Sequence, residues 1–127
     1  MDQAHDHRQL EGLRILVVED EALTALQLED MLESLGCAVV GPAARVQHAI
    51  AMLERESVDL ALLDLNVAGE LVYPVAAALS ERNLPFLFTA GLGTTSLQNG
   101  YDGHVVLQKP YALAELRDGI LSSLTAL

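Results

Sequence analysis

Three carboxylates and one lysine each follow a short apolar run, and together they could bind a metal ion and act on a phosphoryl group. The side chains are those of Glu19, Asp20, Asp64 and Lys109. Carboxylates held close together repel one another, and a hard cation such as Mg²⁺ relieves that repulsion. With the metal bound, a carboxylate can attack phosphorus, while the metal and a lysine neutralise the phosphoryl oxygens. The pattern therefore predicts an Mg²⁺ site with phosphoryl chemistry, provided that the fold brings these residues together.

Short apolar runs bounded by turn residues predict five strands, and stretches with a helical period predict the helices between them. The strands are expected at 14–19, 37–40, 60–64, 85–89 and 105–108. The helices are expected at 21–35, 46–55, 74–83 and 112–124. We expect Asp20 to be the N-cap of the first helix, and Pro74 to occupy the first position of the third. Gly41-Pro42 is expected to end the second strand.

Strands that alternate with helices predict an α/β domain with a parallel sheet. We expect a flavodoxin-like, doubly wound sheet of five strands in the order 2-1-3-4-5, with strands 1 and 3 at the ligand-binding switch point. That order places Glu19 and Asp20 beside Asp64. Residues 91–103 are rich in glycine, which disfavours helix, so the fourth helix should be reduced or missing. Residues 1–12 are expected to form a flexible arm and residues 13–127 a single domain.

The net charge, the apolar runs and the cysteine content indicate which partners the protein can bind and in which compartment it is expected. The net charge is −11, with 18 acids against 7 bases, which argues against nucleic acid and anionic membranes as partners. An acidic chain is compatible with a cation site or a basic protein partner. No apolar run approaches the length of a membrane span, no secretory signal begins the chain, and the single cysteine, Cys37, cannot form an internal disulfide. We therefore expect a cytoplasmic protein.

Short motifs follow the predicted strands in a defined order. They are Val17-Val18-Glu19-Asp20-Glu21, Leu62-Leu63-Asp64-Leu65-Asn66, a hydroxyl residue at the end of the fourth strand, and Lys109-Pro110. In this order and spacing, over residues 13–125, the chain resembles the receiver domain of two-component response regulators. Each motif is weakly specific alone, whereas the ordered set is strongly specific.

The resemblance implies a role for each residue of these motifs. Asp64 would accept the phosphoryl group from a sensor histidine kinase or a phosphotransfer protein. Glu19 and Asp20 would hold Mg²⁺ with Asp64 and the main-chain carbonyl of Asn66. Lys109 would contact the phosphoryl group, next to a cis Lys109-Pro110 bond.

One subgroup of receivers is especially similar to this chain. Its members carry a Phe-Ala-Thr-Gly-(Gly/Tyr) sequence after the fourth strand, have a reduced fourth helix and are mostly stand-alone receivers of alphaproteobacteria. Here the sequence is Phe88-Thr89-Ala90-Gly91-Leu92, so Thr and Ala are transposed. Without a bulge, Ala90 takes the place of the switch hydroxyl, and Thr89 faces the opposite side of the strand. Val106 is not aromatic either, so the usual Thr-to-aromatic switch is weakened.

Several functions remain open from the sequence. The first is a phosphorylatable single-domain receiver, not an enzyme, that signals by contact with a downstream protein or acts as a phosphate sink. The second is a receiver-like binding module with a weakened switch, which Thr89-Ala90 favours. The third is an Mg²⁺-dependent aspartyl phosphatase, although Asn66 stands where such enzymes carry a second Asp. The fourth is a nucleotide-binding flavodoxin-like protein. It is the weakest of the four, because no glycine-rich phosphate loop follows strand 1 in this chain.

Overall fold

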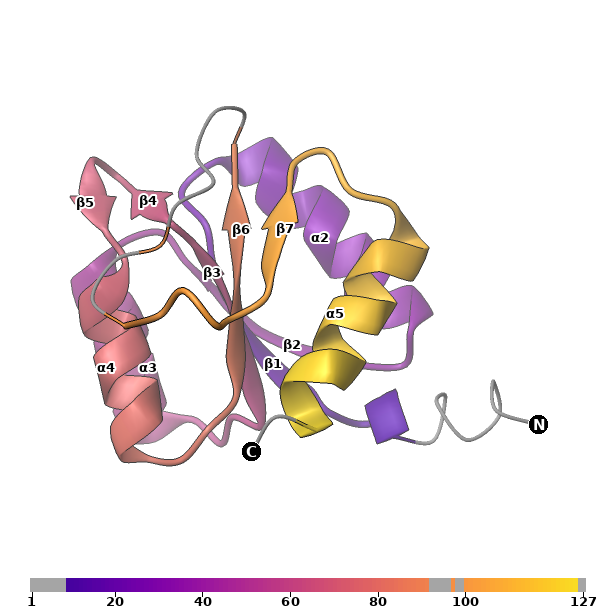
Figure 1. Cartoon of the computed structure of the whole chain (residues 1–127), viewed down its shortest axis with the longest axis horizontal. Helices are drawn as coiled ribbons and strands as arrows, with labels where there is room; N and C mark the ends of the chain where they lie inside the picture. Colours follow the sequence, from indigo (N-terminus) through magenta and orange to yellow (C-terminus); the bar gives the residue numbers. More distant parts are fainter. Residues whose placement is uncertain (1–8, 92–96, 98–99, 126–127) are drawn as a thin grey trace.

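A twisted five-stranded parallel sheet in the order β2-β1-β3-β6-β7 forms the centre of the molecule, as the sequence predicts (Figure 1). The computed structural model describes residues 9–91, 97 and 100–125. The strands of the sheet are β1 (Arg14–Val18), β2 (Ala38–Ala43), β3 (Leu60–Asp64), β6 (Phe86–Ala90) and β7 (Val106–Gln108). The helices are α2 (Ala22–Ser34), α3 (Val46–Arg55), α4 (Tyr73–Glu81) and α5 (Leu113–Thr125). A separate hairpin of β4 (Asn66–Val67) and β5 (Glu70–Leu71) follows β3.

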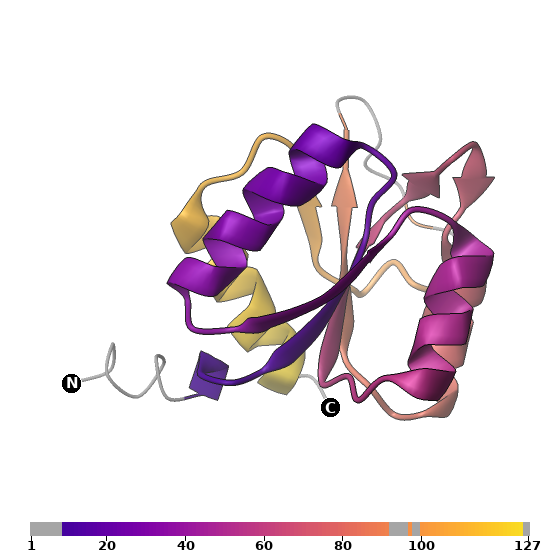
Figure 2. The same ribbon diagram turned by 180° about the vertical axis from the view of Figure 1, so that it is seen from behind.

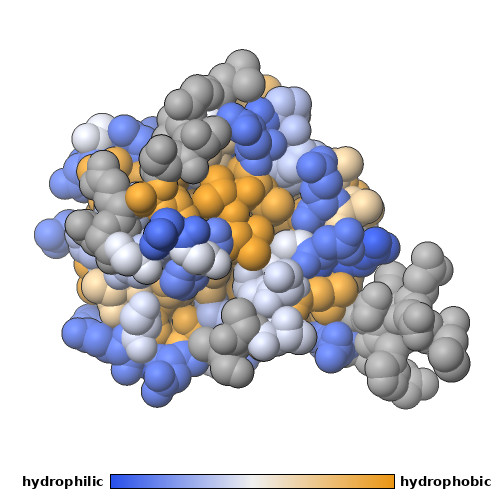
Figure 3. Space-filling view, viewed as in Figure 1, coloured by the Kyte–Doolittle hydropathy of each residue, from blue (hydrophilic) through white to orange (hydrophobic). Residues whose placement is uncertain are grey.

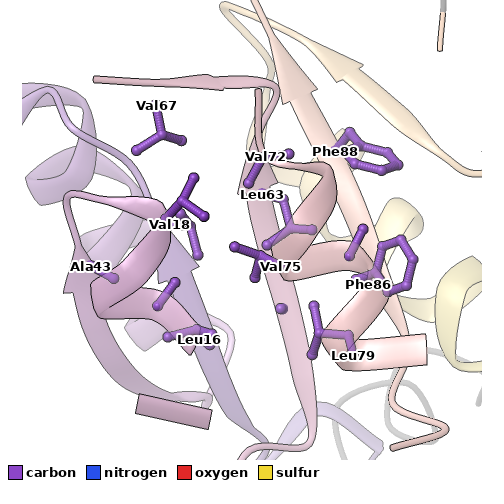
Figure 4. Packing of buried hydrophobic residues seen from close by; sticks show 14 of the residues in the cluster. Leu16, Val18, Ala43, Leu63, Val67, Val72, Val75, Leu79, Phe86 and Phe88 are labelled. Atoms are coloured by element: carbon purple, nitrogen blue, oxygen red, sulfur yellow. The ribbon is translucent and has the colours of Figure 1, made fainter. Parts of the chain in front are cut away.

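The helices cover both faces of the sheet, with α3 and α4 on one side and α2 and α5 on the other (Figures 1 and 2). Side chains alternate along each strand, so each face of the sheet buries its own apolar cluster. Leu63 and Phe88 pack on the side of α3 and α4 (Figure 4). Leu62 and Leu87 pack on the side of α2 and α5. The central strands are thus fixed from both faces, and their carboxyl ends meet at one edge.

Three local predictions need correction. The N-cap of α2 is Glu21 rather than Asp20, and its side chain makes no capping hydrogen bond. Strand β2 continues through Gly41-Pro42 to Ala43, because an edge strand tolerates proline. The structure also contains the β4–β5 hairpin, in a segment where the sequence predicts neither strand nor helix.

The packed domain begins closer to the N-terminus than the sequence predicts. Leu10 is fully buried, and the Gly12 N–H donates to the Gly36 carbonyl oxygen. The packed domain therefore includes part of the predicted arm, whereas residues 1–8 lie outside the described part of the chain.

The crossover between β6 and β7 contains no helix among its described residues, 91, 97 and 100–105. Most of the predicted glycine-rich loop, residues 92–96 and 98–99, lies outside the described residues. Aromatic contacts hold the described end of the crossover against the sheet. Tyr101 stacks on Tyr73 with ring centroids 5.4 Å apart, and His104 stacks on Phe86 at 4.6 Å. Ring packing therefore positions this end of the crossover without a helix.

On the face seen in Figure 3, apolar residues gather over β6 and β7, and hydrophilic residues surround them. Among the described residues, the large apolar side chains that are exposed are those of Leu23, Leu26, Leu71 and Leu113. Within the described part of the chain, every helix is too short or too polar to cross a membrane.

Candidate functional site

The three predicted carboxylates converge at the carboxyl edge of the sheet. Strands β1 and β3 are adjacent, with Val18 paired to Leu63, so the residues that follow them emerge side by side. One carboxylate oxygen from each of Glu19, Asp20 and Asp64 lies within 4.8 Å of the others. The convergence predicted from the strand order is therefore present.

Lys109 reaches the same cluster from the end of β7. Its ammonium Nζ lies 2.8 Å from Oε1 of Glu19 and 3.2 Å from Oδ2 of Asp64. The Lys109 N–H donates to the Ala90 carbonyl oxygen, which ties the residue to β6. The Lys109-Pro110 peptide bond is cis, as the family resemblance implies. A lysine and two carboxylates from three strands therefore form one charged group.

Burial and mutual charge shift the pKa values of Asp64 and Lys109 in this group. The Glu19 and Asp64 side chains are only 3% and 12% exposed, and that of Lys109 is 23% exposed. Desolvation first, and then the nearby Glu19 charge, raise the pKa of Asp64 to about 6, although Lys109 opposes the shift. Desolvation disfavours the charged form of Lys109, but its hydrogen bonds and the two carboxylates outweigh this effect and raise its pKa. Asp64 therefore carries a carboxylate that a further cation would stabilise.

Asp20 is held differently from the other two carboxylates. It is exposed, and its Oδ2 accepts a hydrogen bond of 3.1 Å from the backbone N–H of Ala68, in the turn of the β4–β5 hairpin. Asn66 begins that hairpin, two positions after Asp64, and is also exposed. The role of Ala68 cannot be predicted from the sequence, because a backbone amide in a turn carries no residue-type signal.

The structure separates Thr89 from Ala90 as alternation along the strand requires. Phe88 and Ala90 pack on the side of α3 and α4, whereas Leu87 packs on the opposite side. Thr89 therefore faces the Leu87 side, where it is 3% exposed and paired in register with Asp64. The pairing of β6 with β7 runs without a register shift through Ala90 and Gln108, so no bulge moves Thr89 to the position of Ala90.

An open groove of about 390 Å³ lies beside Lys109, between α2 and the segment Lys109-Pro110-Tyr111 that follows β7. Thr24 and Met31 line it from α2, and Tyr111 lines it from the other side. Burial raises the pKa of Tyr111 to about 12, so its phenol stays protonated at neutral pH. A larger cavity of about 450 Å³ adjoins Phe86 at the amino end of β6, away from the carboxylates.

The donor set suits Mg²⁺. This ion prefers oxygen ligands, keeps several of its waters and is usually held by one or two carboxylates together with a phosphate. The cluster offers three carboxylates, and its only cationic partner within the described residues is Lys109. Glu19 and Asp64 are buried, and the single positive charge of Lys109 compensates only part of their negative charge. A divalent cation would compensate the remainder.

Comparisons with known proteins agree with this architecture. Residues 15–120 match the family described as the response regulator receiver domain. The solution structure of SdrG from Sphingomonas melonis Fr1 is 40% identical, with a TM-score of 0.76 over 91% of this chain and 95% of that one. A response regulator receiver protein from Sinorhizobium medicae WSM419 is 27% identical, with a TM-score of 0.80 over 92% and 98% of the two chains.

A curated relative is the transcriptional regulatory protein PdtaR from Mycobacterium tuberculosis, which is 28% identical over 81% of this chain. The match covers 52% of that protein, so the chain spans about half the length of this relative.

Proposed function

The chain belongs to the response regulator receiver domain family, and we propose that it accepts a phosphoryl group on Asp64 from a histidine kinase or a phosphotransfer protein. The family consists of signalling regulators of two-component systems. The observation that carries the proposal is the meeting of Asp64 with Glu19, Asp20 and Lys109 at the carboxyl edge of the sheet.

The geometry suits phosphoryl transfer to Asp64. A pKa of about 6 leaves this carboxylate mainly ionised at neutral pH, so it can act as a nucleophile. An Asp64 oxygen would bond to phosphorus as the P–N bond to a donor histidine breaks, and the electron pair of that bond would stay on the histidine. Lys109, 3.2 Å from Asp64, would pair with a phosphoryl oxygen. Bound Mg²⁺, held by Glu19, Asp20, Asp64 and the Asn66 carbonyl, would neutralise the phosphoryl charge.

A donor protein can reach this edge of the sheet. The groove beside Lys109 is open, and Leu23 and Leu26 on the neighbouring helix α2 are 66% and 55% exposed. Leu23 and Leu26 lie three positions apart in this helix, so they share a face, and contiguous exposed apolar surface marks many protein-binding sites. We therefore propose a protein as the phosphoryl donor and place both proteins in the cytoplasm. The net charge of −11 argues against nucleic acid as a partner. The product of the reaction is the phosphorylated protein itself.

The signal would pass to a downstream protein by contact, or the domain would act as a phosphate sink. SdrG, the 40% identical relative, has also been solved in a conformation described as activated by BeF₃, which mimics a phosphoryl group on aspartate. Ala90 supports a second candidate, a binding module in which phosphorylation is only weakly coupled to shape, because its side chain offers no hydroxyl. The signalling family makes the aspartyl phosphatase a weaker candidate than either.

Beryllofluoride binding tests the proposal without a partner protein. In the presence of Mg²⁺, beryllofluoride should shift the backbone amide resonances at the ends of β1, β3 and β7. Asp64→Asn should abolish these shifts, and Asp118→Asn should keep them, because Asp118 is a 68% exposed surface residue that pairs with Arg117. Equal shifts in Asp64→Asn would contradict the role of Asp64.

A further inference from the structure

The hairpin that follows Asp64 turns through a strained alanine. Its strands pair Asn66 with Leu71 and Val67 with Glu70, which leaves Ala68 and Gly69 as a two-residue turn. Both residues have positive φ, 52° at Ala68 and 83° at Gly69. Positive φ at both central residues defines a type I′ turn, which strongly prefers Asn or Gly over Ala at its first position. The turn therefore keeps a costly conformation at Ala68.

That conformation aims the Ala68 amide at the carboxylate of Asp20. The N–H donates to Oδ2 of Asp20 at 3.1 Å, between residues 48 positions apart in the chain. Lys109 donates to Glu19 and Asp64, whereas among the described residues the Asp20 carboxylate accepts its hydrogen bond from the Ala68 amide. An exposed aspartate without such a bond would exchange between rotamers.

The hairpin is anchored well enough to hold this amide in place. Val67 and Val72 are fully buried in the apolar cluster that also contains Val18 and Leu63 (Figure 4). The Val72 N–H donates to the Leu65 carbonyl oxygen and closes the base of the hairpin. The Leu65 N–H in turn donates to the Thr89 carbonyl oxygen of β6. The turn is therefore fixed to the sheet at its base.

We propose that the backbone amide of Ala68 is a positioning group that orients the Asp20 carboxylate for Mg²⁺. The inference rests on the proposed Mg²⁺ site and adds to it a residue outside the carboxylate set. Groups that hydrogen-bond to metal ligands fix the orientation of those ligands and commonly affect metal affinity. The hairpin is then part of the metal site through its backbone, and the positive φ at Ala68 is the conformation in which its N–H donates to Asp20.

The hydrogen bond itself is tested in metal-free protein by amide hydrogen exchange measured by NMR. The Ala68 amide should exchange at least several-fold faster in Asp20→Ala than in the wild type. The Val72 amide serves as the control, because its bond to Leu65 does not involve Asp20. Equal Ala68 exchange in the two proteins would overturn the proposal.

Metal affinity tests the positioning role with two substitutions at the same residue. Ala68→Gly keeps the N–H and suits the positive φ, so its Mg²⁺ dissociation constant, measured by NMR titration, should stay close to that of the wild type. Ala68→Pro removes the N–H and cannot adopt φ near 52°, so the dissociation constant should rise about tenfold. Wild-type affinity in Ala68→Pro would overturn the role of Ala68 alone. Absence of Mg²⁺ binding in the wild type would overturn the proposed function as well.

Discussion

Lys109 Nζ lies 2.8 Å from Oε1 of Glu19, although β3 and β6 separate the strands that carry the two residues. The lysine therefore extends along the carboxyl edge of the sheet and places its charge among the carboxylates. Since Glu19 is almost completely buried, this ammonium supplies the compensation that a buried carboxylate requires. The ion pair thus links the stability of the fold to the chemistry of the site.

Loss of Lys109 should destabilise the metal-free protein. Lys109→Met leaves the buried Glu19 carboxylate without its hydrogen-bonded cation, so we expect the free energy of unfolding at pH 7 to fall by about 1–3 kcal/mol. Urea denaturation in the presence of a chelator measures this change. Arg117→Met is the matched control, because it removes a surface ion pair with Asp118 and should cost less than about 1 kcal/mol. Equal losses in the two variants would contradict the compensating role of Lys109.

The raised pKa of Asp64 should make stability depend on pH in a defined direction. The folded-state value of about 6 lies above the ordinary value of 3.8, so the folded state binds a proton more tightly than the unfolded state. This residue therefore lowers the stability of the metal-free protein as pH rises from about 4 to about 6. Asp64→Asn removes the effect, and its gain in unfolding free energy over the wild type should be larger at pH 7.5 than at pH 5.

Denaturation of both proteins at the two pH values in a chelating buffer measures that difference. Asp118→Asn, which removes a carboxylate from the surface, is the matched control. A gain for Asp64→Asn that is the same at both pH values would show that burial of Asp64 does not penalise its charge.

Magnesium should stabilise the folded protein. An ion that binds only the native state raises the melting temperature by mass action, and the rise should grow with the Mg²⁺ concentration. Asp20→Ala removes one carboxylate of the site and should shift this dependence to higher concentrations. A melting temperature that does not respond to millimolar-range Mg²⁺ in the wild type and in Asp20→Ala alike would contradict the metal site.

The position of Ala90 predicts a weakened response to phosphorylation. In the wild type, beryllofluoride with Mg²⁺ should add little hydrogen-exchange protection to residues 100–105, because Ala90 offers no hydroxyl and Thr89 faces the other side of β6. Ala90→Thr should gain protection there. Strong protection in the wild type that disappears in Thr89→Ala would show instead that Thr89 performs the switch.

Local sequence patterns predicted the parts of the fold that depend on buried, continuous apolar runs. Leu60–Asp64 is one example, because a strand buried on both faces carries apolar residues on both. The alternation of strands and helices predicted a parallel sheet, and the flavodoxin-like strand order expected for such a sheet placed Glu19 beside Asp64. The sheet and its carboxylate cluster could therefore be inferred before any coordinates.

Other features depend on tertiary contacts that no local pattern contains. The β4–β5 hairpin has strands of two residues each and an alanine in the left-handed region, so neither alternation nor turn composition marks it. The Ala68 amide and the distance from Lys109 to Glu19 are set only when distant segments pack together. Strand β2 likewise passes through Gly41-Pro42 because its place at the edge of the sheet leaves room for proline.

Phosphorylation of Asp64 is the central claim, and intact-mass spectrometry tests it most directly. The wild-type protein, incubated with a small phosphodonor and Mg²⁺, should gain the mass of one phosphoryl group. The gain should be absent without the metal and absent in Asp64→Asn, and it should persist in Asp118→Asn. An Asp64→Asn protein that takes up the same phosphoryl group to the same extent would contradict the account.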